Sequence, residues 1–432
     1  MRTMAAKSAS RMRRWMLGVL LRLPGGGSDP ASLLARFPDE ALMPLRRTGL
    51  DPVPALGAMR DKDPVSRLKM PLGLRGWLVT GYGESRAVLA ADHDTFSNDF
   101  GNMIGKVGIA AEQDPGGLGF ADPPAHTRLR HMLTAHFTTR ALATWAPRVE
   151  QIVDEALDEM ARLGAEGAPV DLQKHFAVPI PSRLIMELLG IEVDDHTEFL
   201  RLSTERFDFA GGATTSLNVI QESIDYLEAI VARQRIEPGP GLIGSILSEY
   251  GDHVSDIELA GLADGVLVGG LETTVSMLAL GAVCLLQDRA AFDALLEADA
   301  VGVDRLVEEM LRYLTVVQVG FPRFAVRDVT LGGHEIFAGD VVVCSLSAAN
   351  RDPRHDTNLD RVDHTRTPPG HLAFGHGIHR CVGAELGRME LRLAYPALVR
   401  RFPQLRLAVA PTELTYRETS VVYGLTGLPV LL

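Results

Sequence analysis

The protein has 432 residues, of which 46% are hydrophobic, so it can bury a large core and is neither disordered nor fibrous. Its formal net charge of −12 and its pI near 5.6 argue against general nucleic-acid binding, which needs a basic field to displace phosphate counterions. Its three cysteines, Cys284, Cys344 and Cys381, are widely spaced, which supports neither a disulfide framework nor a zinc cluster and favours a reducing cytoplasm.

The N-terminal segment 1–29 differs from the rest of the chain. Basic residues precede a short apolar run at 15–21, which faintly resembles a signal peptide. The run is too short to cross a bilayer, and no small-residue cleavage site follows it. We predict that residues 1–29 are a flexible cytoplasmic extension and that residues 30–432 form one domain. Membrane-surface contact or targeting is the alternative for the extension.

Helical periodicity dominates the remaining chain. Apolar residues recur at helical spacing in six segments: 128–137, 147–162, 180–190, 215–235, 255–287 and 303–313. Strand-like alternation is confined to 76–80 and to 324–345, where Gly332-Gly333 marks a turn. The sequence therefore predicts a mainly α fold with a minor β region.

The segment 374–383, FGHGIHRCVG, carries the most specific chemistry. Its glycines allow a tight backbone that can approach a flat ligand: Gly375, Gly377 and Gly383. Cys381 precedes a predicted helix starting at Ala384, and the amides of a helix N-terminus favour thiolate over thiol. Phe374 can cover the sulfur. Thiolate ligation favours O–O cleavage at haem iron, whereas the alternative is a buried, inert cysteine.

This segment resembles the haem-binding loop of the cytochrome P450 family, whose Phe, Gly, Cys and Gly fall at Phe374, Gly377, Cys381 and Gly383. Three further motifs in the family's order extend the resemblance over about residues 30–432. The sequence FGHGIH is most similar to that of soluble bacterial members. The resemblance implies the P450 fold, with a long central helix over a haem b (iron protoporphyrin IX) ligated by Cys381 and contacted by Phe374, Gly375 and Gly383.

The second motif lies in the apolar segment after Ser255. Ser255 with Glu258 three residues later is typical of a capping box at a helix N-terminus. The glycine pair 269–270 weakens this helix locally, because each glycine costs about 1 kcal/mol relative to alanine.

The same helix contains Glu272, Thr273 and Thr274. In the family the matching stretch is kinked over the haem, and an acid and an alcohol relay protons to dioxygen. The resemblance implies that Thr273 hydrogen-bonds the oxygen being activated and that Glu272 feeds protons through water. Thr274 is not assigned a role. The alternative is a solvated glutamate beside glycines that only ease packing.

The third motif is Glu309-Met310-Leu311-Arg312. Glu309 and Arg312 share a helix face and can pair. By resemblance they form the family's structural Glu–Arg pair, with Arg351 of the segment 350–353 as the third member. An ordinary surface ion pair is the alternative.

Haem propionates need cationic donors in this acidic chain. The resemblance assigns that role to His126, Arg130, Arg323 and His379. His126 and Arg130 are four residues apart and share one helix face, and His379 lies two residues before Cys381. The alternative is that each is a surface or locally capped residue.

Arg380 departs from the apolar residue that is frequent before the cysteine. With Arg388 and Arg392 it predicts a basic patch where an acidic ferredoxin, supplied by an NAD(P)H-dependent ferredoxin reductase, would dock. A plain solvated face is the alternative.

The substrate is predicted only as a class. By position, five mostly apolar or small segments line a pocket for a medium to large hydrophobic molecule: 101–120, 207–215, 265–269, 316–320 and 421–424. Gln318 and Tyr423 are possible polar anchors, and the loop 102–119 is a plausible entrance.

The favoured function is insertion of one atom of dioxygen, as hydroxylation or epoxidation, with electrons from ferredoxin. A peroxygenase is the alternative on the same fold, although it would usually lack the pair Glu272 and Thr273. A haem carrier without turnover and a Cys–His hydrolase using Cys381 with His376 or His379 are the remaining hypotheses.

Overall fold

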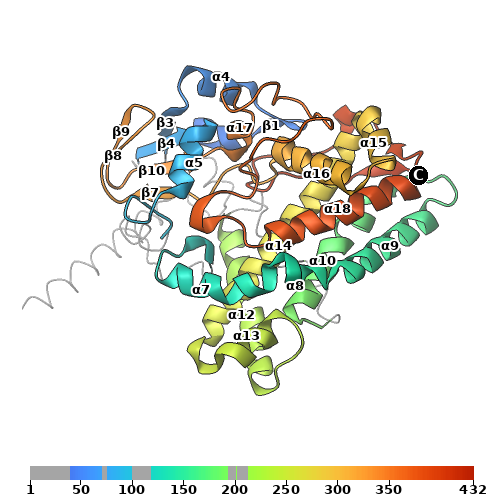
Figure 1. The fold of residues 1–432 in the computed structure, drawn as a ribbon, viewed down its shortest axis with the longest axis horizontal. Helices are drawn as coiled ribbons and strands as arrows, with labels where there is room; N and C mark the ends of the chain where they lie inside the picture. The colour runs from blue at the N-terminus through green and yellow to red at the C-terminus, as the bar shows by residue number, and fades with distance from the viewer. Residues whose placement is uncertain (1–38, 71–74, 100–117, 193–200, 202–212) are drawn as a thin grey trace, which may run out of the picture.

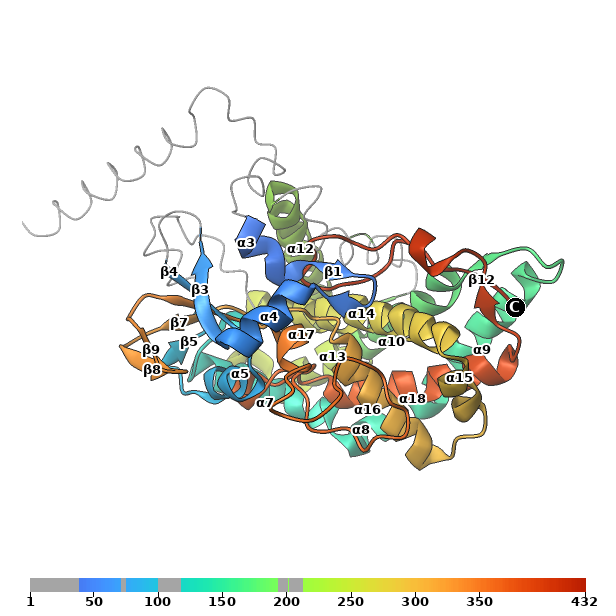
Figure 2. The same cartoon turned by 90° about the horizontal axis from the view of Figure 1, so that it is seen from above.

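The apolar segment 255–287 forms the central helix α14 (Asp256–Gln287) of the computed structural model, which describes residues 39–70, 75–99, 118–192, 201 and 213–432. Residues 1–29 lie outside the described residues. The predicted capping box is present: the Ser255 hydroxyl accepts from the Glu258 amide, and the Glu258 carboxylate accepts from the Ser255 amide. Figures 1 and 2 show α14, in yellow, running through the middle of the molecule.

Helix α14 is apolar on nearly all sides because it is packed on nearly all sides. The helices α10 (Pro179–Leu189), α12 (Ala213–Ile236) and α18 (Ala384–Arg401) surround it. It is long and apolar enough to cross a membrane, but 78% of its most apolar stretch is buried inside the fold, as in a core helix. The glycine pair 269–270 does not end the helix.

The other predicted helices are also present. They are α7 (Ala125–Thr134), α9 (Ala146–Leu163), α10, α12 and α16 (Ala300–Leu314), and α18 follows the cysteine as expected. Further short helices fall outside the predicted segments: α4 (Pro54–Lys62), α5 (Tyr82–Ala90), α8 (Thr139–Ala143), α13 (Leu242–Tyr250), α15 (Arg289–Leu296) and α17 (Leu346–Ala349). With at most nine residues, each offers too few turns for a clear periodicity.

A small sheet lies to one side of the helices (Figure 1). Its strand order is β3-β4-β10-β7-β5, and β10 runs parallel to β4 while the other pairs are antiparallel. The strands are β3 (Val65–Lys69), β4 (Arg75–Val79), β5 (Phe96–Ser97), β7 (Arg323–Ala325) and β10 (Val341–Cys344).

Three smaller sheets complete the β region. The predicted turn at Gly332-Gly333 joins β8 (Val329–Leu331) to β9 (His334–Ile336). The remaining strands are β1 (Arg47–Thr48), β2 (Asp51–Pro52), β6 (Val170–Asp171), β11 (Arg406–Leu407) and β12 (Pro429–Leu431). The prediction of a mainly α fold with a minor β region is confirmed.

The fold brings α5, α7, β7 and α18 together around the segment 374–383. Gly377 has φ +75°, and a Cβ there would lie 2.3 Å from the Leu89 carbonyl oxygen on α5, so only glycine lets the segment pack this closely. Asp122 accepts from Ser97 and Asn98 at 2.5 and 3.0 Å, which fixes the start of α7 against β5.

Candidate functional site

The segment 374–383 is a closed loop. The Cys381 amide donates to the Phe374 carbonyl at 2.9 Å, and Gly375 and Gly377 both adopt positive φ. The loop ends at Gly383, which is the N-cap of α18. The predicted tight backbone and the predicted helix after Cys381 are therefore both present.

Cys381 differs from the other two cysteines. Cys284 and Cys344 are buried, and burial raises the pKa of each thiol to about 12. Cys381 is exposed at the mouth of its loop. Burial of the sulfur against the surrounding protein raises the pKa of Cys381, and the Gly383 amide and the charge of Arg130 offset only part of that rise.

Four cationic side chains converge beside this loop. His126 and Arg130 come from α7, Arg323 from β7 and His379 from the loop itself. The rings of His126 and His379 lie 4.2 Å apart, and Arg130 donates to the Arg380 carbonyl at 2.7 Å. The structure thus brings together the four residues that the sequence singles out from three distant segments.

This cationic cluster has no ion pair to an acidic side chain of the described residues, although the charge of Asp122 acts on His126 and Arg323. His126 and Arg323 are 3% and 4% exposed, yet the Nε2 atom of His126 and the Nε atom of Arg323 have no hydrogen-bond partner there. Burial, reinforced by Arg323, His126 and Arg130, lowers the pKa of His379 to about 3. The buried Arg323 guanidinium, together with two neighbouring histidines that would gain protons beside a negative charge, indicates a binding site for an anionic group.

One face of α14 is open although the helix is otherwise buried. Gly265, Val268, Gly269 and Thr273 lie on this face at i, i+3, i+4 and i+8. A Cβ at Gly265 or Gly269 would meet no heavy atom within 4 Å among the described residues. The Thr273 hydroxyl donates to the Gly269 carbonyl at 2.5 Å. The threonine is therefore held at this open face by its own helix.

Glu272 is not a solvated glutamate. Its side chain is 4% exposed and forms an ion pair with Arg417, which also donates to the Ser276 hydroxyl at 2.9 Å. Burial raises the pKa of Glu272, and Arg417 opposes that rise. The sequence gives no signal for Arg417, because it lies 145 residues away in the C-terminal segment.

Glu309 and Arg312 form the predicted pair. The guanidinium donates to both carboxylate oxygens at 2.8 Å, and both side chains are at most 1% exposed. The assignment of Arg351 as the third member is wrong. Arg351 pairs with Asp51 at 3.1 Å, whereas Arg366 lies 3.4 Å from the Glu309 carboxylate. Alternation and spacing do not reveal Arg366, which reaches Glu309 from an irregular segment.

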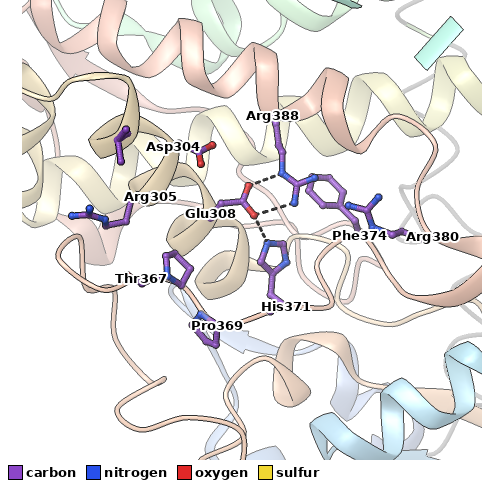
Figure 3. Close-up of a pocket in the computed structure, with 12 residues that line it drawn as sticks. Asp304, Arg305, Glu308, Thr367, Pro369, His371, Phe374, Arg380 and Arg388 are labelled. Carbon is purple, nitrogen blue, oxygen red and sulfur yellow. Dashed lines mark hydrogen bonds and ion pairs between the residues drawn. The ribbon is translucent and has the colours of Figure 1, made fainter. Parts of the chain in front are cut away.

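The predicted basic patch is only partly present. Figure 3 shows Arg388 and His371 directed at Glu308, with Phe374 and Arg380 beside them. Arg388 also donates to Glu385 at 2.9 Å, and Arg392 pairs with Asp304. The positive charges of Arg388 and Arg392 are therefore compensated, whereas Arg380 is exposed with no ion pair to a described residue.

The two predicted substrate anchors have other partners. The side-chain amide of Gln318 donates to the Leu45 and Ser420 carbonyls at 2.8 and 2.7 Å, and its oxygen accepts from Arg47 at 2.9 Å. The Tyr423 hydroxyl donates to the Gly49 carbonyl at 2.6 Å. Both side chains brace the fold, which corrects their assignment. The predicted entrance, 102–119, and the segment 207–215 fall largely outside the described residues.

The family follows from comparison with known proteins. The cytochrome P450 family model matches residues 242–413. Cytochrome P450 165B3 of Amycolatopsis orientalis is 40% identical over 394 residues, which cover 89% of this chain and 97% of the relative. The chain belongs to the cytochrome P450 family.

Two further P450 relatives resemble the chain over most of its length. Mycinamicin IV hydroxylase/epoxidase of Micromonospora griseorubida is 37% identical over 382 residues, which cover 87% of this chain and 94% of the relative. The solved structure of OxyE, a cytochrome P450 involved in teicoplanin biosynthesis, matches with a TM-score of 0.80 and 36% identity over 92% of this chain and 100% of OxyE.

The protein is therefore a cytochrome P450 monooxygenase, and its family uses a haem-thiolate iron. The residues present fit such a group. The cationic cluster leaves buried polar atoms unsatisfied beside an exposed cysteine that directly precedes the N-terminus of α18, and a haem carries both an iron and two carboxylates.

Proposed function

We propose that this P450 inserts one atom of dioxygen, as hydroxylation or epoxidation, into a medium to large hydrophobic molecule of secondary metabolism. The proposal treats residues 30–432 as one catalytic domain in the cytoplasm and residues 1–29 as an extension. One large hydrophobic core that includes residues from α7 to the C-terminal strand supports a single domain.

The observation that carries the proposal is the cationic cluster beside the Cys381 loop. We assign His126, Arg130, Arg323 and His379 to the propionates of haem b, and Phe374, Gly375 and Gly383 to contacts with the ring. Cys381 would ligate the iron. When bound, the haem supplies oxygen activation, which thiolate ligation favours.

We assign proton delivery to Glu272 and Thr273. Thr273 lies on the open face of α14, where its hydroxyl, held at the Gly269 carbonyl, would pass on a proton that reaches it from Glu272. Glu272 precedes Thr273 in the chain and is buried, so its carboxyl group would exchange protons with solvent through polar groups such as its partner Arg417. The pair supports ferredoxin-driven turnover over the peroxygenase alternative.

The substrate class is supported by the pocket wall and by the relatives. Gly265 and Gly269 give α14 an open, side-chain-free surface, and Val316–Gly320 is mostly apolar. The relatives include a mycinamicin IV hydroxylase/epoxidase and a P450 involved in teicoplanin biosynthesis. We infer that this chain acts on a molecule of similar size and polarity.

We place ferredoxin docking at the face shown in Figure 3. Arg305 and Arg380 lie at this pocket without an ion pair to any described residue, so their fields reach a negatively charged partner. An NAD(P)H-dependent reductase would supply the ferredoxin. This assignment replaces Arg388 and Arg392 as the steering charges.

The haem assignment is tested by the spectrum of the ferrous carbon monoxide complex. We expect a thiolate-type spectrum in the wild-type protein that is lost in Cys381→Ser. Cys344→Ser is the matched control, because that buried thiol should leave the spectrum unchanged. A thiolate-type spectrum in Cys381→Ser would show that the ligand is misassigned.

The reaction is tested by turnover with hydrophobic candidate substrates that displace the axial water. We expect NADH-dependent product formation only when a ferredoxin and its reductase are both present, with one oxygen atom from isotopically labelled dioxygen in the product. Product formed equally well from hydrogen peroxide without ferredoxin would support the peroxygenase instead.

A further inference from the structure

The C-terminal hairpin, residues 415–426, delivers one arginine to the acid of α14. Its backbone is paired between Arg417 and Gly424 at 2.9 Å and between Thr426 and Thr415 at 3.0 Å. From this hairpin the Arg417 side chain, 21% exposed, reaches Glu272 and the Ser276 hydroxyl one turn further along the helix. The two partners hold the guanidinium in one orientation against the helix.

Gly424 is the residue that makes room for this guanidinium. A Cβ at Gly424 would lie 2.2 Å from Arg417 Nη2 and 2.6 Å from Ser276 Oγ, distances that real Cβ atoms do not show. The backbone of Gly424 does not adopt a positive φ, so alanine is conformationally allowed there. Alanine at 424 would therefore displace Arg417 without straining the main chain.

The other edge of the hairpin is part of the proposed substrate pocket. The backbone amide of Gln318 donates to the Val421 carbonyl at 3.0 Å, and the backbone amide of Tyr423 donates to the Val316 carbonyl at 2.8 Å. Val421 and its neighbours thus form one β-bridged wall with the segment 316–318. The same hairpin contacts the pocket wall on one side and Glu272 on the other.

The electrostatics of Glu272 depend on this one contact. Among the described residues, Arg417 is the charged group that acts on Glu272, and Arg417 is also held by the Ser276 hydroxyl of α14. The nearest buried acid of α18, Glu390, hydrogen-bonds Thr274, and burial raises its pKa, which favours its neutral form. Burial favours the neutral carboxyl, and Arg417 favours the carboxylate. Loss of the contact would leave a buried acid with no compensating cation.

We propose that Arg417 is a positioning residue that fixes the orientation and charge of Glu272, with Gly424 providing the clearance, so that proton delivery is set from the substrate-facing hairpin. This inference rests on the proposed role of Glu272. In each delivery Glu272 takes one proton from solvent water and passes one on toward Thr273, returning to the carboxylate, while Arg417 stays protonated.

Infrared spectroscopy of the ferric holoenzyme tests the proposal without turnover. We expect no protonated Glu272 at pH 7 in the wild-type protein. Arg417→Gln and Gly424→Ala should each show a new carboxylic-acid C=O band that disappears when Glu272→Gln is added. Arg417→Lys should keep the carboxylate, and Arg406→Gln, which removes an exposed positive charge from strand β11, should resemble the wild type.

Turnover provides the second measurement. Because loss of Arg417 would raise the pKa of Glu272, the limb of the pH profile that depends on Glu272 should move to higher pH in Arg417→Gln. The fraction of dioxygen released as hydrogen peroxide should increase several-fold. Arg417→Lys should restore both properties.

The outcomes separate this inference from the proposed function. Absence of the new band in both Arg417→Gln and Gly424→Ala overturns the positioning role, even in a fully active enzyme. If Gly424→Ala does not fold, Arg417→Gln alone decides the question. If the bands appear but Glu272→Gln turns over and couples like the wild type, the positioning role stands and the proton-delivery role of Glu272 fails.

Discussion

Two buried charged regions of this P450 have opposite construction. Around Glu309, the carboxylate accepts from Arg312 through both oxygens and also from the Asp363 amide at 3.0 Å, so the negative charge is fully compensated. Beside Cys381, the basic side chains of the cationic cluster lie together without an ion pair to a described acidic residue, and His126 and Arg323 each keep an unpartnered nitrogen within the described residues. Compensated charge is a support of the fold, whereas uncompensated charge indicates a ligand.

The largest effect should come from the compensated region. Glu309→Ala leaves the Arg312 guanidinium buried without its partner, which we expect to lower the free energy of unfolding by about 3–5 kcal/mol. Denaturant unfolding followed by circular dichroism measures this. Glu159→Ala is the control, because Glu159 and Arg162 have the same i, i+3 spacing on an exposed helix face. An equally small loss of unfolding free energy in both variants would contradict the structural role of the buried Glu309–Arg312 pair.

In the cationic cluster we expect the opposite result: a substitution should weaken haem binding but not the stability of the haem-free protein. Arg323→Leu removes a buried cation that forms no ion pair with a described residue, so the unfolding free energy of the haem-free protein should stay the same or rise. Haem should dissociate about ten to a hundred times faster, since one hydrogen bond to a charged group contributes about 1.5–3 kcal/mol. Transfer of haem to an acceptor protein measures the rate. Destabilisation of the haem-free protein as large as in Glu309→Ala would make Arg323 another structural cation.

Local sequence patterns were sufficient for much of this architecture. The capping residues Ser255 and Glu258 and the loop around Cys381 each depend on neighbours within a few residues, and both are found as predicted. The cations on α7 and β7 could be assigned by resemblance because each motif is local, although their convergence is a property of the fold.

Long-range partners could not be predicted in this way. Arg366 replaces Arg351 at Glu309, and Arg417 reaches Glu272 across 145 residues, because packing rather than spacing decides which side chains meet. Gln318 and Tyr423 failed as substrate anchors for the same reason: nearby backbone carbonyls use their polar atoms.

Acid should weaken the compensated network at Glu308. Burial acts to raise the pKa of Glu308, but hydrogen bonds from His371 and Arg388 outweigh it and lower the pKa to about 2. A carboxylate whose pKa is lower in the folded state than in the unfolded state stabilises the folded protein. This stabilisation is complete above the unfolded pKa, near 4.5, and is lost as the pH falls toward 2. Glu308→Gln should therefore show a shallower decrease in unfolding free energy over this range. Denaturant unfolding at several pH values measures the slope, and parallel slopes would contradict the assignment.

The smallest effect should come from cations that lack partners at the surface. Arg305→Gln should slow reduction by ferredoxin several-fold at low ionic strength, and salt should diminish the difference because exposed charges are screened beyond about 10 Å at 0.1 M. The matched control removes the ion pair between Asp304, which lines the same pocket, and Arg392: Asp304→Asn with Arg392→Gln leaves the net charge unchanged. Stopped-flow reduction at several salt concentrations measures both variants. An equal loss in the control would mean that shape rather than charge at this face governs docking, and the distinction between compensated and uncompensated charge would then apply only to the interior.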